Sequence, residues 1–165
     1  MPKGISTSNT EWFYLLGEFG VRVEGNRSVI IQKPEKLTCG DLAEQGYPFY
    51  GGKLFFETEI ETKGDAVLKF PAFGGTFVKT YVDGKASGIA AYPPHRIALK
   101  DLTAGTHKLT VELCLPRTNS FGPVHFKDGA DSYLSPNTYR TVGENWSDDY
   151  VLAKQGLLEA PVMEE

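Results

Sequence analysis

Two long segments of this chain alternate apolar and polar side chains, and this period of two constrains its fold more than any other feature. In residues 53–61 the set Leu54, Phe56, Thr58 and Ile60 alternates with Phe55, Glu57, Glu59 and Glu61. In residues 106–116 the set Leu109, Val111, Leu113 and Leu115 alternates with Lys108, Thr110, Glu112 and Cys114. Successive side chains of a strand point to opposite faces. Each segment is therefore predicted to be a half-buried strand with its carboxylates mainly in water.

Turn signals between the apolar segments predict hairpins. Asp83-Gly84 separates residues 76–82 from 85–90, and Asp-Gly suits a type I′ turn because both residues need a positive φ. Gly25-Asn26 predicts a second hairpin between residues 18–24 and 28–33. No window shows a sustained helical stripe. We expect helix only as one short turn at 41–45, with Asp41 as its N-cap and Gly46 as its stop.

These signals together predict an all-β fold. The 18 Gly and 10 Pro punctuate segments rich in Val, Ile, Phe, Tyr and Thr, which is typical of many short strands. We expect a two-sheet antiparallel β-sandwich (a jelly roll) of about eight or nine strands, with a barrel as the alternative. It should form a single domain over residues 1–165, with its core in about 11–158.

The pattern changes after Pro116. Residues 117–139 show little alternation, and irregular segments of this length in a compact domain are usually functional or interfacial. We expect a last strand at 146–152. The acidic tail at 159–165 is expected to be loose.

Charge and targeting signals exclude several classes of protein. The net charge of −4 gives no reason to expect binding to nucleic acid or to an anionic membrane. The sequence has no run of about 18 apolar residues, and its first residues lack the apolar region of a secretory signal. The chain is expected either to stay inside the cell or to be exported as part of a larger parent protein.

The two cysteines do not form a recognisable motif. Cys39 and Cys114 lie far apart and have no CxxC partner, which excludes a small disulfide scaffold and a zinc ribbon. Two separate buried thiols are favoured over one bridge.

Catalytic patterns are missing from the sequence. It has no G-x-S-x-G motif. His95, His107 and His125 are isolated along the chain, whereas metal sites normally cluster such ligands. We therefore expect no catalytic residue and no cofactor in this chain. The alternative is a small stand-alone β-sandwich enzyme, which would need acidic or histidine side chains to converge in a pocket.

Two sets of acidic residues each have two possible interpretations. Glu57, Glu59 and Glu61 share a strand face, and a solvated outer face is favoured over the paired carboxylates of a glycosidase. Asp128 and Asp131 lie in a glycine-containing loop. Their oxygens could help to bind a structural Ca²⁺, although a solvated turn is favoured.

Aromatic residues, 12% of the chain, are the remaining chemical resource. The ones of interest are Trp12, Tyr47, Phe49, Tyr50, Tyr92, Tyr133, Tyr139, Trp146 and Tyr150. Flat rings can stack on the apolar face of a sugar while nearby polar groups bind its hydroxyls. The alternative is that they fill the core or cover a partner domain.

Several motifs together resemble a known family. The segment Gly-Tyr-Pro-Phe-Tyr-Gly-Gly at 46–52, the strand at 54–60 and the Asp83-Gly84 hairpin resemble the galactose-binding-like β-sandwich. More narrowly, they resemble a non-catalytic domain at the C-terminal end of bacterial glycoside hydrolases related to family 2. The segment Arg-Thr-Asn-Ser-Phe-Gly-Pro-Val-His at 117–125, the run 146–150 and Gly156-Leu157 extend the resemblance over residues 40–158. Val124 stands where the family pattern has a first histidine, so a site built on a His-His pair is not expected.

The resemblance implies an accessory domain at the C-terminal end of a larger protein. It would contact carbohydrate or support the catalytic module of that parent protein. The aromatic and polar residues after Pro116 suggest the contacting group Asn119, His125, Tyr139, Trp146 and Asp148. In this group Asn119 and His125 would bind hydroxyls, and Trp146 or Tyr139 would stack on a ring. A purely structural, interdomain-packing domain is the alternative, and it predicts an exposed apolar patch around 117–146.

Overall fold

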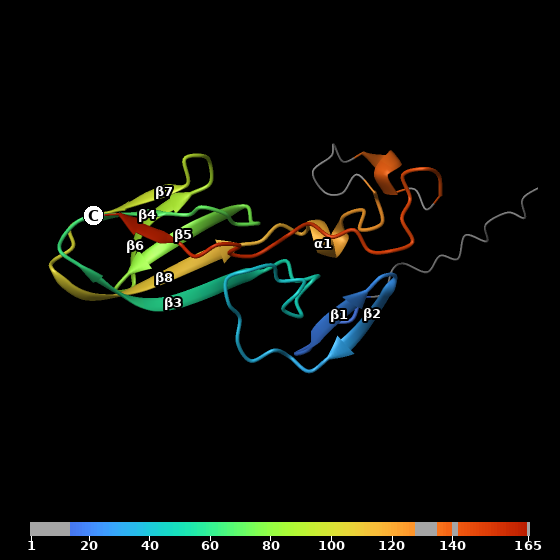
Figure 1. The fold of residues 1–165 in the computed structure, drawn as a ribbon, viewed down its shortest axis with the longest axis horizontal. Helices are drawn as coiled ribbons and strands as arrows, with labels where there is room; N and C mark the ends of the chain where they lie inside the picture. Colours follow the sequence, from blue (N-terminus) through green and yellow to red (C-terminus); the bar gives the residue numbers. More distant parts are fainter. Residues whose placement is uncertain (1–13, 128–134, 140–141, 165) are drawn as a thin grey trace, which may run out of the picture.

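The structure is a computed structural model that describes residues 14–127, 135–139 and 142–164, and it is almost entirely β (Figure 1). Its strands are β1 (Gly20–Glu24), β2 (Arg27–Ile31), β3 (Lys53–Thr62), β4 (Ala66–Lys69), β5 (Phe77–Val82), β6 (Lys85–Ala90), β7 (Arg96–Leu99), β8 (Gly105–Cys114) and β9 (Val162–Glu164). The helical parts are α1 (Thr118–Phe121) and the short 3₁₀ turn η1 (Pro136–Tyr139). The prediction of an antiparallel all-β fold with eight or nine strands is confirmed.

Two antiparallel sheets form the sandwich. One has the strand order β3-β8-β5-β6, and the other has the order β7-β4-β9. In the first sheet β8 lies between β3 and β5, with Leu113 opposite both Leu54 and Val78. The core contains Leu68, Ile97 and Leu99 from the second sheet and Val78, Val111 and Leu113 from the first. The alternation read from the sequence therefore places the buried face of β8 correctly.

Both predicted hairpins form. Asp83 and Gly84 have φ values of 49° and 77°, as the two central residues of a type I′ turn require, and they join β5 to β6. Gly25, with a φ of 60°, begins the turn between β1 and β2.

The expected helix at 41–45 is wrong, because these residues form turns. Asp41 does accept a hydrogen bond from the Ala43 amide (3.1 Å), as a cap would. The Leu42 amide, however, donates to the carbonyl of Gln155, 2.7 Å away. The Leu42 carbonyl accepts from the Gln45 amide (3.1 Å) and the Tyr47 amide (2.8 Å), and these spacings of three and five residues close turns, whereas an α-helix needs a spacing of four.

Two further expectations about the C-terminal part are wrong. Residues 146–152 form no strand, although Trp146 makes an isolated bridge with Phe126. The tail is not loose, because β9 pairs with β4. Met163 packs against the core, and Glu164 forms an ion pair with Arg96.

A small lobe lies at the end of the sandwich where β8 finishes. The lobe comprises residues 14–19, β1, β2, α1, η1 and residues 123–127 and 142–152, and it lies to the right in Figure 1. Residues 153–157 connect it back to the sandwich. There Gly74 and Gly156 exchange backbone hydrogen bonds of 2.8 and 3.0 Å. A Cβ on Gly74 would lie 2.1 Å from the Lys154 carbonyl oxygen, so this close approach requires glycine.

The cysteines and the acidic face of β8 differ in part from expectation. Both thiols are free, but Cys39 is exposed and Cys114 is half-buried. Glu112 lies on the outer face of its sheet as predicted, yet only 4% of it is exposed. Tyr81 and Lys53, from the two neighbouring strands, cover it.

Within residues 14–127, 135–139 and 142–164, no helix has the length and apolar character needed to cross a membrane.

Candidate functional site

The small lobe contains a cluster of three aromatic side chains from two segments. The ring of His125 lies 4.7 Å, centroid to centroid, from the rings of both Trp146 and Tyr150, at interplanar angles of 32° and 36°. Tyr150 also contacts Phe49, with centroids 5.4 Å apart. Each of the three clustered rings is half-buried. Each ring therefore keeps part of its surface in solvent while its orientation is fixed by its neighbours.

Hydrogen bonds fix which polar atoms of the cluster remain open. His125 Nδ1 lies 3.1 Å from the carbonyl oxygen of Ser147. A carbonyl only accepts, so Nδ1 carries a proton, and Nε2 is the acceptor in the tautomer that this contact selects. Trp146 Nε1 donates to Asp148 Oδ1 at 2.9 Å, which leaves Oδ2 without a hydrogen bond inside the described ranges. An imidazole nitrogen and a carboxylate oxygen thus flank the rings.

The clustered residues belong to no regular strand, and backbone hydrogen bonds hold them in position. The Ser147 amide donates to the His125 carbonyl (2.8 Å), and the Val151 amide donates to the Val124 carbonyl (2.7 Å). The Tyr150 amide donates to Gly25, at the β1–β2 turn (3.0 Å). These bonds hold residues 146–151 against 124–126 and the hairpin, so residues far apart in sequence form one cluster.

Two members of the sequence-predicted group lie elsewhere. Asn119 is only 3% exposed, and its side chain exchanges two hydrogen bonds of 2.9 Å with the backbone of Ala153. Its amide is therefore occupied in holding α1 to residue 153, and Asn119 does not fit the role of a hydroxyl-binding residue. Tyr139 points to Phe121, whose carbonyl accepts its hydroxyl at 3.4 Å, and not to the cluster of His125.

The cluster includes one residue that the sequence-predicted group lacks. Tyr150 completes the three-ring contact with His125 and Trp146. The run Trp-Ser-Asp-Asp-Tyr at 146–150 contains this signal, because it places two aromatics four residues apart.

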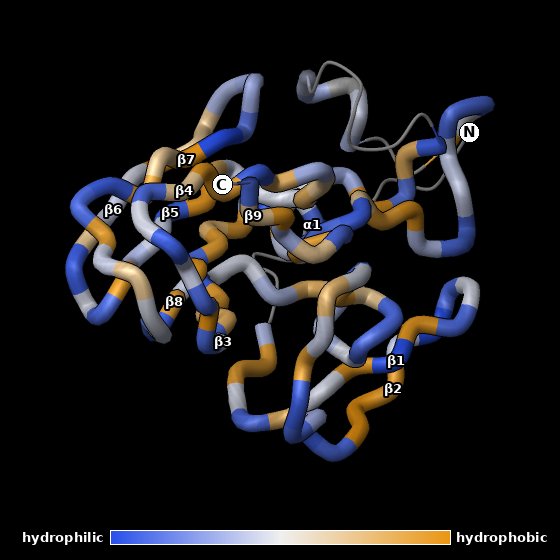
Figure 2. Tube along the Cα trace, turned by 60° about the vertical axis from the view of Figure 1, so that its left-hand side comes forward, coloured by the Kyte–Doolittle hydropathy of each residue, from blue (hydrophilic) through white to orange (hydrophobic). Residues whose placement is uncertain are grey.

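The same lobe exposes large apolar side chains. Tyr14 and Phe121 pack edge to face, with centroids 5.1 Å apart, and Tyr139 lies against the same segment. Phe121 is 51% exposed and Leu16 is 90% exposed. The complete set is Tyr14, Leu15, Leu16, Val29, Ile30, Phe121, Tyr139 and Val142, here called the apolar lobe surface. In Figure 2, β2 is one of the hydrophobic stretches that lie outside the sandwich. In the described part of 117–146, Phe121, Tyr139 and Val142 are exposed, and an apolar patch around this segment stays a prediction.

A buried carboxylate lies on the outer face of the β3-β8-β5-β6 sheet. Glu112 accepts a hydrogen bond from the Tyr81 hydroxyl (2.6 Å) and pairs with Lys53 Nζ (2.7 Å). These two partners, Lys53 first, hold the pKa of Glu112 below its ordinary value. The group is therefore ionised and fully paired, which is a structural arrangement and not that of a general acid.

The three histidines each have a different neighbour, so they do not form one site. His95 contacts Phe73, His107 contacts Asp83, and His125 belongs to the lobe cluster. Among the residues that the structure describes, no three His, Cys, Asp or Glu side chains are grouped to hold a metal. Asp128 and Asp131, the residues considered for Ca²⁺, lie outside the described ranges, as do Trp12 and Tyr133.

Comparison with known proteins gives structural neighbours. The chain is similar to a family 2 β-galacturonidase from Eisenbergiella tayi, with 26% identity, a TM-score of 0.48 and coverage of 89% of this chain. It is similar to a rhamnosidase from Novosphingobium sp. PP1Y, with 16% identity, a TM-score of 0.50 and coverage of 96%. It is also similar to a β-D-mannosidase from Dictyoglomus thermophilum, with 20% identity, a TM-score of 0.43 and coverage of 90%.

The chain spans less than a quarter of each of these structures, at 22%, 16% and 22% respectively. The rhamnosidase likeness supports the fold. No family model and no curated protein matches the sequence.

Proposed function

We propose that this chain is a non-catalytic accessory domain of a larger glycoside hydrolase and that its small lobe docks on the catalytic module. The apolar lobe surface carries this proposal. Large apolar groups that lie exposed beside one another often mark an interaction surface, and here Tyr14 and Tyr139 both contact the exposed Phe121. The sequence resemblance supplies the class of parent protein, and the neighbours named above, of which this chain spans a minor part, are consistent with it.

The β1–β2 hairpin supports the same proposal. It is a two-stranded sheet that joins neither sheet of the sandwich, and two-stranded hairpins are marginally stable alone. Val29 and Ile30 on β2 are exposed. A partner that covers them would bury apolar area and hold the hairpin in place.

The test uses the parent's catalytic module as a separate chain and measures its association with this domain by calorimetry. Phe121→Ser should weaken the complex at least about tenfold, because a large apolar contact is replaced by a polar group. Phe55→Ser is the matched control, since Phe55 is a phenylalanine of similar exposure (60%) on the outer face of β3. Equal affinities for the two variants would overturn docking through the lobe.

A second function, contact with carbohydrate, is favoured by the cluster of His125, Trp146 and Tyr150 with Asp148. Partly exposed rings of fixed orientation can stack on a sugar. His125 Nε2 and Asp148 Oδ2 can accept hydrogen bonds from hydroxyls. Asn119 and Tyr139 do not belong to this group.

This second function is tested by calorimetry and affinity gels against a panel of neutral plant and mucin glycans. Trp146→Ala should reduce the affinity for any glycan bound by about tenfold or more, because it removes a stacking ring. Tyr92→Ala, at an exposed aromatic in the β6–β7 loop, should leave binding unchanged. If the folded chain binds none of the panel, or if Trp146→Ala binds normally, this function is excluded.

A further inference from the structure

A polar groove lies at the end of the sandwich opposite the small lobe. It encloses about 710 Å³ between the β5–β6 hairpin, β7 and the segment that leads into β8. The groove is at the start of β8, whereas the lobe follows its end, and the strand has 10 residues. At about 3.3 Å per residue the two regions are roughly 30 Å apart. The groove is therefore distinct from the aromatic cluster.

The floor of the groove is built from the close approach of the two sheets. Gly88 of β6 faces Ile97 of β7, and a Cβ on Gly88 would lie only 2.6 Å from Ile97 Cγ2. Ile97 is buried, so it cannot move aside without disturbing the core. Glycine at this position allows the two strands to meet below an open groove.

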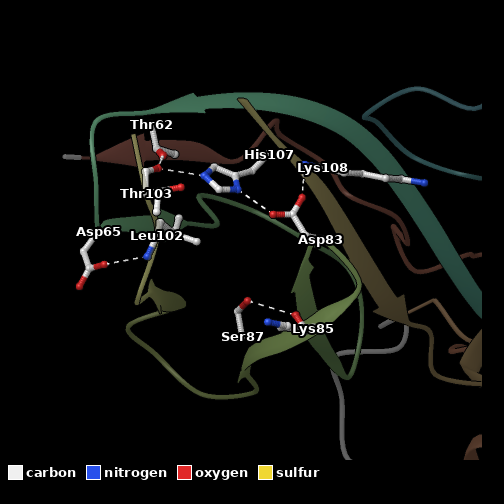
Figure 3. Close-up of polar contacts among 9 residues, drawn as sticks. All are labelled: Thr62, Asp65, Asp83, Lys85, Ser87, Leu102, Thr103, His107 and Lys108. Atoms are coloured by element: carbon white, nitrogen blue, oxygen red, sulfur yellow. Dashed lines mark hydrogen bonds and ion pairs between the residues drawn. The ribbon is translucent and has the colours of Figure 1, made fainter. Parts of the chain in front are cut away.

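One wall is fixed by a histidine whose two ring nitrogens both face acceptors. His107 Nδ1 lies 2.7 Å from Asp83 Oδ2, and Nε2 lies 2.9 Å from the Thr103 carbonyl oxygen (Figure 3). Asp83 Oδ1 accepts a further hydrogen bond from the Lys108 amide, at 2.9 Å. The hydrogen bond that His107 donates to the Asp83 carboxylate is the main cause that raises the pKa of His107. The wall is thus an ordered pair of His107 and Asp83, and both groups are held in place by further hydrogen bonds.

The cations that remain come from opposite walls. Lys85 starts β6 in one sheet, and Lys100 follows β7 in the other, and both line the groove. Neither ammonium has a hydrogen bond or ion pair within the described ranges. The third cation, Arg96, is paired with Glu164. The exposed carboxylate of Asp101 also has no hydrogen bond or ion pair within the described ranges. Two unpaired ammonium groups therefore face one unpaired carboxylate, and this balance is positive in a chain whose net charge is −4.

Hydroxyl groups lie beside these cations. Ser87 is half-buried, and its Oγ makes only a long contact of 3.4 Å to the Lys85 carbonyl. Ser87 and Lys85 both line the groove, and Figure 3 shows them beside each other. Thr103 lines the facing wall. A ligand here would meet two ammonium donors and neutral groups that exchange hydrogen bonds with hydroxyls.

From this arrangement we infer that the groove is a second ligand site, for a sugar that carries an anionic group. Lys85 and Lys100 would bind the anionic group from two sides, and Ser87 and Thr103 would contact ring hydroxyls. The choice of a sugar rests on the proposed function, whereas the preference for an anion rests on the groove itself. Charge-assisted hydrogen bonds are stronger than neutral ones, so the anionic group should dominate the affinity.

The experiment titrates the ¹⁵N-labelled chain with methyl β-D-glucuronide, methyl β-D-glucoside and sodium sulfate, each at constant ionic strength. Glucuronide should shift backbone amide resonances in residues 83–89 and 100–107, and the glucoside should leave them in place. The double variant Lys85→Ala/Lys100→Ala should bind glucuronide at least about tenfold more weakly. Lys36→Ala/Lys154→Ala removes the same charge from exposed sites outside the groove and should bind as the parent chain does.

The outcomes separate this inference from the proposed function. Unmoved groove amides with glucuronide, or equal shifts with the glucoside, would overturn it. Sulfate shifts as large as those of glucuronide would also overturn it as a sugar site, because the sugar ring would then contribute nothing. Docking by Phe121 and neutral-glycan binding by Trp146 are measured at the other end of the molecule, so either can succeed or fail independently.

Discussion

At the scale of single residues, some buried polar side chains are hydrogen-bonded and others are not. Asn119 and Glu112 are buried and fully hydrogen-bonded. Thr80 and Gln155 are also buried, but their side-chain polar atoms have no partner within the described ranges. An unsatisfied buried polar group costs about 1–3 kcal/mol. These two positions are therefore weak points of an otherwise well-packed core.

Thr80→Val should stabilise the domain. Thr80 is fully buried, on the core face of β5, and valine has nearly the same shape without the hydroxyl. We expect the free energy of unfolding to rise by about 1 kcal/mol, measured by urea denaturation. Thr106→Val is the control at an exposed position of β8, and it should change stability by less than about 0.5 kcal/mol. A loss of stability in Thr80→Val would show that the hydroxyl has a favourable partner.

At the scale of elements, the Asp83-Gly84 turn connects three strands. It joins β5 to β6, and the Asp83 carboxylate also binds the Lys108 amide and His107 on β8. The dipeptide predicts the hairpin from local geometry alone. Its second role depends on the position of β8, which no local pattern specifies.

This connection should make stability depend on pH. The pKa of His107 is raised in the folded state, mainly by Asp83, so its contribution is complete below about pH 6.5 and is lost as pH rises through the folded pKa. The pKa of Asp83 is lowered, mainly by His107 and then by the Lys108 amide. Its contribution is complete above about pH 3.9 and is lost as pH falls through its folded pKa. The link should therefore be strongest between about pH 4 and 6.5.

Urea unfolding midpoints across this range provide the measurement. Lys85 also lies near Asp83 and lowers the pKa of Asp83. The same measurement on Lys85→Ala therefore shows how much Lys85 contributes to the loss of stability at acidic pH. His107→Gln should remove the decline on the alkaline side, whereas His95→Gln, at a residue packed on Phe73, should retain it. An unchanged alkaline decline in His107→Gln would refute the assignment.

The sequence predicts correctly those elements whose residues show a clear local pattern, such as alternation of apolar and polar side chains. Residues 53–61 and 106–116 alternate clearly, and both are strands in the structure. Residues 41–45 offer a helix cap and stop, yet their local hydrogen bonds close turns, and the Leu42 amide bonds the distant carbonyl of Gln155. The segment 146–152 lacks a strand because its amides pair with 124, 125 and the β1–β2 turn.

At the scale of the whole molecule, the chain has two ends with different chemistry. The small lobe gathers aromatic and apolar side chains, while the groove at the far end of the sandwich gathers charged groups (Figure 3). The sandwich keeps the two ends apart, so the proposed docking at one end would leave the proposed ligand site at the other end open.

The candidate site was predicted in part. His125, Trp146 and Asp148 meet in the lobe, and the residue types after Pro116 suggested them. Asn119 was chosen for the same reason, but burial against Ala153 gives it a structural role. The groove of Lys85 and Lys100 was not predicted, because its walls come from strands of two different sheets.

The sequence by itself determined the all-β class, the two hairpins and the buried faces of the long strands, because these depend on side chains two residues apart and on turns of two residues. Only the tertiary structure decided which distant segments meet. The aromatic cluster, the tethering of Asn119, the pairing of the tail with β4 and the groove all arise from contacts between residues far apart in sequence, and such contacts leave no periodic signal.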